Sequence, residues 1–147
     1  MGEYGPASQL VDRLIDRVRL LTPDEAADLF RARAYRAVDR GEDADRVAHN
    51  EAARAAAVTG RRKEYWAARR AASAAWQHAR QGTVGPWLSV GVAVADAAGA
   101  LVVEDLLSAR TFDMLFGPWQ QAIGRLQPVG PGVPFGERVP ALRGGRG

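Results

Sequence analysis

Alanine is the feature that most constrains this chain, since it accounts for 28 of the 147 residues. Alanine has the highest helix propensity, and its short side chain lets two helices approach closely. The chain contains no cysteine, which excludes disulfides, thiolate nucleophiles and cysteine-ligated metal sites. Its length is typical of one domain with a single core. The sequence therefore predicts an all-α protein, a compact bundle of five to six helices.

Apolar residues at helical spacing predict the first two helices. Residues 8–21 form the first, because apolar positions recur there every three or four residues. The segment Thr22-Pro23-Asp24-Glu25 is typical of a capping box with proline in the first turn, and it predicts a second helix that ends at Gly41. The residues of that helix expected to face the core are Ala27, Phe30, Ala34, Ala37 and Val38.

Later helices are expected from Asp43, as a cap, to Gly60, and over residues 62–81. Residues 87–107, after Pro86, are predicted as a fifth helix. A β-hairpin is the alternative, because Val90, Val92 and Val94 alternate with other residues, but the many alanines of this segment favour a helix. Thr111 is expected to cap a short helix that ends at Gly117, and Pro118 to begin another.

The C-terminal segment differs from the rest of the chain in composition. Ten of the 21 residues in 127–147 are proline or glycine, and the segment has no hydrophobic periodicity. Such a segment cannot bury enough apolar surface to offset the entropy lost on ordering. We therefore expect a helical domain over residues 1–126 and a disordered or extended tail over residues 127–147.

Two segments near the end of this domain carry a resemblance to known proteins. They are residues 96–107, which read DAAGALVVEDLL, and residues 112–124, which contain FDMLFGPW followed by AIG. With the Ala/Arg/Trp-rich run upstream, the chain resembles a group of alanine-rich helical proteins from actinobacteria and their phages. The resemblance implies a helix over residues 87–107. It implies no activity, because no function is assigned to that group.

The apolar segment at residues 87–103 contains a single charge, Asp96. Its 17 residues fall short of the roughly 20 that a membrane-spanning helix needs, and a central carboxylate disfavours insertion. We therefore expect a buried central helix. The first residues lack a basic stretch followed by an apolar run, so the sequence predicts a cytoplasmic protein.

The helix over residues 62–80 combines basic and aromatic residues on one face. Residues 61–81 contain six basic residues and one acid, Glu64, a net charge of +5. The candidate nucleic-acid-binding residues on this face are Arg62, Lys63, Trp66, Arg69, Arg70 and Arg80. Guanidinium groups neutralise phosphates, and an exposed indole can stack on a base. The alternatives are an ordinary solvated face and a surface for an acidic protein or an anionic membrane.

Asp96 is the candidate buried acid of the central helix. A buried carboxylate requires a partner or a raised pKa. One interpretation is a structural ion pair with an arginine of a neighbouring helix, and the other is an acid that handles protons or binds a ligand.

The sequence contains no recognisable catalytic or cofactor-binding motif. His49 and His78 lie on different predicted helices and have no second ligand at metal-binding spacing, so we expect neither a metal nor a cofactor. The leading hypothesis is therefore a non-enzymatic protein that binds another protein or its own copy through alanine-rich helix faces. Nucleic-acid binding is the second hypothesis, and a small-molecule enzyme that uses Asp96 is the third.

Overall fold

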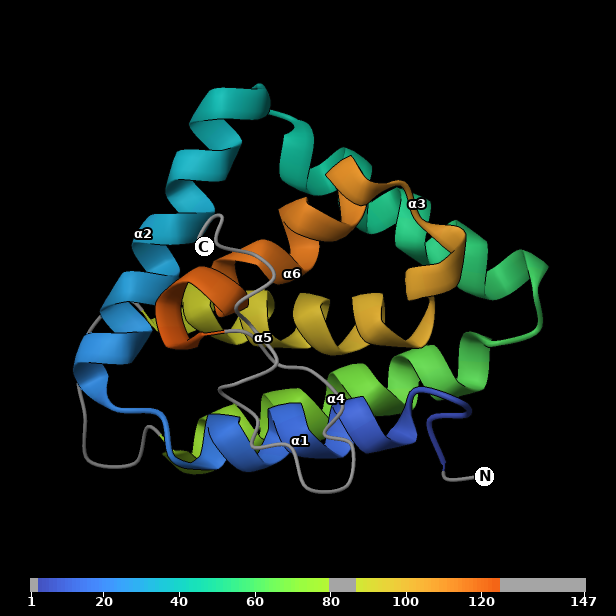
Figure 1. The fold of residues 1–147 in the computed structure, drawn as a ribbon, viewed down its shortest axis with the longest axis horizontal. Coiled ribbons are helices and arrows are strands. Elements are labelled where there is room, and N and C mark those ends of the chain that lie inside the picture. Colours follow the sequence, from blue (N-terminus) through green and yellow to red (C-terminus); the bar gives the residue numbers. More distant parts are fainter. Residues whose placement is uncertain (1–2, 80–86, 125–147) are drawn as a thin grey trace, which may run out of the picture.

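The computed structural model describes residues 3–79 and 87–124. In those ranges the regular elements are six α-helices and one 3₁₀ turn (Figure 1). They are α1 (Ser8–Arg19), α2 (Pro23–Arg40), α3 (Ala44–Val58), α4 (Arg62–Ala79), α5 (Trp87–Val102), η1 (Glu104–Leu106) and α6 (Ala109–Ile123). The predicted all-α bundle is confirmed. The expected tail, Arg80 and the proposed helix start at Pro86 lie outside the described residues.

Helix α5 lies at the centre of the bundle, with α1 and α4 on one side and α6 on the other (Figure 1). It contacts each of the other five α-helices, and its second half is buried almost completely. The prediction of a helix here, rather than a hairpin, is confirmed. None of the helices in the described part of the chain is long and apolar enough to cross a membrane.

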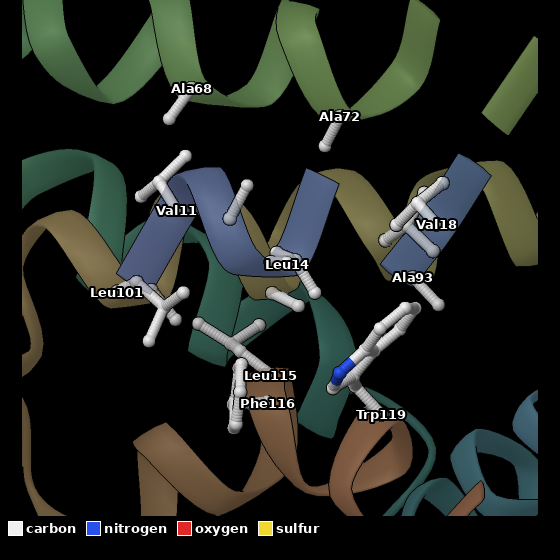
Figure 2. Close-up of a cluster of buried hydrophobic side chains, with 14 of the residues drawn as sticks. Val11, Leu14, Val18, Ala68, Ala72, Ala93, Leu101, Leu115, Phe116 and Trp119 are labelled. Atoms are coloured by element: carbon white, nitrogen blue, oxygen red, sulfur yellow. The ribbon is translucent and has the colours of Figure 1, made fainter. Parts of the chain in front are cut away.

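The alanine faces lie inside the bundle. Ala68 and Ala72 of α4 have no exposed surface, and in Figure 2 they face α1, with Val11 beneath Ala68. Larger side chains of α6, among them Leu115 and Trp119, occupy the space on the other side of α1. Small residues between neighbouring helices and large residues from α6 therefore form one hydrophobic core.

Two of the predicted helix starts differ from the structure. The capping box of α2 is confirmed, because the Glu25 amide donates to Thr22 Oγ1 at 3.2 Å and the Thr22 amide donates to Glu25 Oε1 at 3.0 Å. Asp43 precedes α3 without making a side-chain cap bond. The start of α6 is capped by Ser108, whose hydroxyl accepts from the Thr111 amide at 3.1 Å, so the prediction of Thr111 as the cap is wrong.

The expected break between Gly117 and Pro118 is also wrong, since α6 continues through both residues. Proline inside a helix removes one backbone hydrogen bond. Residues 114–119 are all buried, and this packing outweighs the lost bond.

The inward face predicted for α2 is wrong at Phe30, Ala34 and Val38, which are exposed, whereas Ala37 packs partly against the core. The buried residues of α2 are Ala26, Leu29 and Ala32, whereas Phe30 and Val38 are 39% and 84% exposed. The helix is rotated because Arg33 and Arg36 lie on its inner side, where each pairs with a carboxylate of another helix. A buried carboxylate without such a partner is costly, so the pairing determines the orientation of α2.

Gly99 of α5 lies where α5 packs tightly against α4. A Cβ atom at this position would lie 2.7 Å from Cε1 of Tyr65, whose ring is buried and cannot move aside. We expect Gly99→Leu to lower the free energy of unfolding by about 1–3 kcal/mol or more, as overpacking does. Denaturant unfolding measures the change. The control is Ala74→Leu on the exposed side of α4, with an expected change within about 0.5 kcal/mol; similar effects at both positions would contradict the proposed close packing.

Candidate functional site

Asp96 is the centre of a polar cluster that joins four helices. Its side chain is 2% exposed, and its Oδ2 lies 2.9 Å from Nη2 of Arg33 on α2. Its Oδ1 accepts a hydrogen bond from Nη1 of Arg69 on α4 at 2.5 Å and lies 3.5 Å from Nδ1 of His49 on α3. A single carboxylate of α5 is therefore connected to α2, α3 and α4, and both of its oxygens are engaged.

The charge state of Asp96 follows from these contacts. Burial by itself raises the pKa of this carboxyl, but the hydrogen bond from His49 and the positive charges of Arg33 and Arg69 outweigh it and lower the pKa to about 2. The carboxylate is thus ionised at neutral pH. A general acid or base works best with a pKa near the working pH, so this geometry favours a structural ion pair over a proton-transfer role.

Two further contacts extend the cluster away from Asp96. Arg33 also donates from Nε to Oδ2 of Asp45, on α3, at 3.0 Å. The guanidinium of Arg69 lies 5.2 Å from the ring centre of Trp66 and 5.7 Å from that of Tyr65. The polar cluster therefore runs from buried Asp96 through Arg69 to Trp66, which is 38% exposed at the surface of α4.

The structure divides the predicted basic face of α4 into two parts. Arg62, Lys63 and Arg70 are exposed, and none of them forms an ion pair with another described residue. Arg69 was expected on the same face, but its side chain is 86% buried and turns inward to Asp96. The expectation for Arg69 is wrong, because the buried carboxylate of Asp96 requires a cationic partner and Arg69 supplies one.

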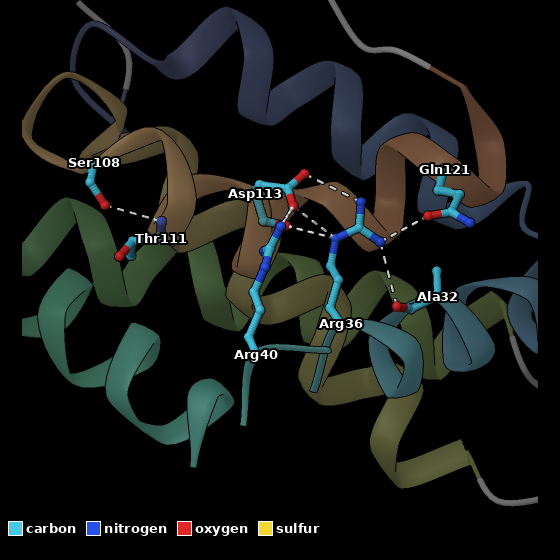
Figure 3. A network of polar contacts seen from close by, with 7 residues as sticks. All are labelled: Ala32, Arg36, Arg40, Ser108, Thr111, Asp113 and Gln121. Carbon is cyan, nitrogen blue, oxygen red and sulfur yellow. Dashed lines mark hydrogen bonds and ion pairs between the residues drawn. The ribbon is translucent and has the colours of Figure 1, made fainter. Parts of the chain in front are cut away.

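A second group of ion pairs joins α2 to α6 (Figure 3). Arg36 donates from Nε to Asp113 Oδ2 at 3.2 Å and from Nη1 to Gln121 Oε1 at 2.9 Å, and Arg40 Nη2 lies 2.6 Å from Asp113 Oδ2. Gly117 makes room for this group, since a Cβ atom there would lie 2.5 Å from both Arg36 Nη2 and Asp113 Oδ1. Gly117, which was predicted to end a helix, therefore leaves room for the ion pair between Arg36 and Asp113.

His49 and Arg33 are partners of Asp96 that the sequence did not predict by number. His49 is separated from Asp96 by 47 positions and belongs to another helix, so no local spacing connects the two. The available signal was indirect: a buried acid requires partners, and Arg33 and His49 are polar residues near the inner sides of α2 and α3.

A pocket of about 570 Å³ lies between the end of α2, the start of α3 and the first turn of α6. It is lined by apolar side chains, among them Val47 and Met114, and by charged side chains of both signs, such as Arg110 and Glu51. Glu51 is already bonded to the Thr111 hydroxyl at 2.9 Å. These groups do not converge on one point, and Asp96 is not part of the lining.

In residues 3–79 and 87–124, no group of three or more His, Asp or Glu side chains is placed to hold a metal ion. Comparisons of the chain with protein-family models, curated proteins and solved structures find no match. The resemblance to alanine-rich actinobacterial and phage proteins therefore stays a prediction.

Removal of the Asp96 charge tests its structural role. We expect Asp96→Asn to lower the free energy of unfolding by about 3–5 kcal/mol, because it leaves Arg33 and Arg69 without their anion. The matched control is Asp105→Asn, which breaks the exposed pair with Arg61 and should cost less than about 1 kcal/mol. Denaturant unfolding of both variants measures the difference, and equal losses would show that Asp96 contributes no more than a surface pair.

Acid titration tests the same carboxylate in the wild-type chain. The folded-state pKa of about 2 lies below the ordinary value of 3.8, so the stabilisation is present above the ordinary value and is lost as the pH falls through 2. The difference corresponds to about 2 kcal/mol. When the pH is lowered through this window, the free energy of unfolding should decrease less for Asp96→Asn than for wild type. Asp113 and Asp105, whose pKa values are also lowered, are present in both proteins, so parallel curves would contradict the assignment.

Proposed function

We propose that this chain is a non-enzymatic interaction protein that associates with a second copy of itself through the outer face of α2. The observation that carries the proposal is an apolar stripe on that face. Phe30, Ala34 and Val38 recur every four residues, so they form one line along the helix, and all three are exposed. Tyr35, which is also exposed, lies beside this line. We call these four residues the α2 stripe.

The α2 stripe has the pattern of a core-facing surface but faces outward. Apolar side chains in such a line normally bury their surface against another element. The inner face of α2 is already used by Leu29 and by the ion pairs of Arg33 and Arg36. Burial of the stripe therefore requires a partner outside the bundle.

The alanine faces contribute to this proposal indirectly. The alanines that line α3, α4 and α5 pack against one another and against α1 within the bundle. Their short side chains bring those helices together and leave no large apolar face on α4. Among the residues whose burial is described, α2 has more exposed large apolar side chains than any other helix, namely Phe30, Tyr35 and Val38.

An antiparallel pair of α2 helices is self-complementary, as a two-fold interface requires. If Ala34 lies on the two-fold axis, Phe30 of each copy meets Val38 of the other. Residues equally far from the axis in opposite directions lie at one level, so this register rests on the contact between Phe30 of one copy and Val38 of the other. Aromatic residues are enriched at protein interfaces, which favours Phe30 and Tyr35 at this position.

Val38→Glu tests the association. It places a charge opposite Phe30 of the second copy, and we expect the dimer to weaken about tenfold or more, because an unpaired buried charge costs about 1.4 kcal/mol or more. Sedimentation velocity over a wide range of protein concentrations measures the monomer–dimer equilibrium.

The matched control is Val58→Glu. Val58 is 75% exposed, and like Val38 it lies in the last turn of its helix, but it belongs to α3. Val58→Glu should leave the equilibrium unchanged. A wild-type chain that stays monomeric at every concentration, or equal effects of the two substitutions, would overturn the proposal.

A further inference from the structure

We infer that the turn of α4 around Trp66 is a binding site for single-stranded nucleic acid. All four positions one helical turn away from Trp66 are basic: Arg62, Lys63, Arg69 and Arg70. The structure assigns them two different roles. Arg62, Lys63 and Arg70 form the exposed cations of the site, and Arg69 supports the indole from within.

The indole of Trp66 is held in place on its inner side. Arg69 is fixed by its 2.5 Å bond to Asp96, and its guanidinium lies 5.2 Å from the ring centre of Trp66. The rings of Tyr65 and His49 contact the indole edge to face, with ring centres 5.3 Å and 6.4 Å away. A side chain that is already fixed loses little entropy when a ligand binds. The remaining exposed part of the indole is therefore a rigid platform.

The surrounding charge indicates what binds on this platform. Arg62, Lys63 and Arg70 have no carboxylate partner among the described residues, so each is free to neutralise a phosphate. An indole flanked by such cations suits a ligand that carries both anionic groups and flat rings. Single-stranded nucleic acid has both, and its unpaired bases are available for stacking, whereas the bases of a duplex are not.

Two other anionic partners fit these residues less well. An acidic protein surface would use the three cations but would leave the indole without a flat partner. A membrane-surface helix needs a broad apolar face, whereas the exposed side of α4 continues from Trp66 to polar Gln77. The site lies on α4 and does not depend on the self-association proposed for α2.

Fluorescence polarisation with labelled single-stranded DNA and RNA oligonucleotides, across a salt series, tests the inference. Three phosphate contacts predict a slope of about −2 for the logarithm of the association constant against that of the salt concentration. We expect Trp66→Ala to weaken binding by about 5- to 100-fold at constant salt, with the slope unchanged, because it removes stacking alone. Trp66→Phe should retain part of the affinity. Arg70→Ala should reduce the slope by about 0.7.

The matched control is Arg110→Ala. Arg110 is exposed on α6 and, like Arg70, forms no ion pair with another described residue, so its removal should leave both affinity and slope unchanged. Circular dichroism confirms that each variant is folded. Equal effects of Arg70→Ala and Arg110→Ala, or no effect of Trp66→Ala, would overturn the site. Binding to phosphatidylserine vesicles without binding to oligonucleotides would overturn it in favour of a membrane.

Discussion

The ionised carboxylate of Asp96, buried in the middle of the central helix, is the constraint on which the arrangement of four helices depends. A charge in an apolar interior is tolerated only when nearby groups compensate for it. Here the compensation comes from three other helices, through Arg33, Arg69 and His49. Because those side chains must reach one point, the rotation of α2 and α4 about their own axes is fixed.

The rotation of α2 has consequences for the surface of the protein. With Arg33 and Arg36 directed inward beside Leu29, the residues of the α2 stripe are directed outward. The ion pairs of Asp113 with Arg36 and Arg40 stabilise the same orientation from the side of α6. The proposed association surface is thus a result of the way in which the interior is neutralised.

The carboxylate of Asp96 also affects the surface of α4, because Arg69 turns inward to pair with it. The other three basic neighbours of Trp66 stay exposed. The indole then lies between a fixed guanidinium below and solvent above. The two proposed binding surfaces, one apolar and one basic, are therefore on different helices but depend on one buried charge.

Local signals in the sequence determined the presence and the approximate limits of most helices. Alanine content, helical periodicity and the Thr22–Glu25 capping box act within one or two turns, so they are visible in the sequence alone. The buried position of Asp96 is likewise visible in the sequence, because its segment is otherwise apolar. Tertiary structure decided which face of α2 is buried, the inward path of Arg69, the contact of His49 with Asp96 and the continuity of α6 through Pro118. Each of these depends on an ion pair or on packing between helices far apart in the chain, and such energies have no local sequence pattern.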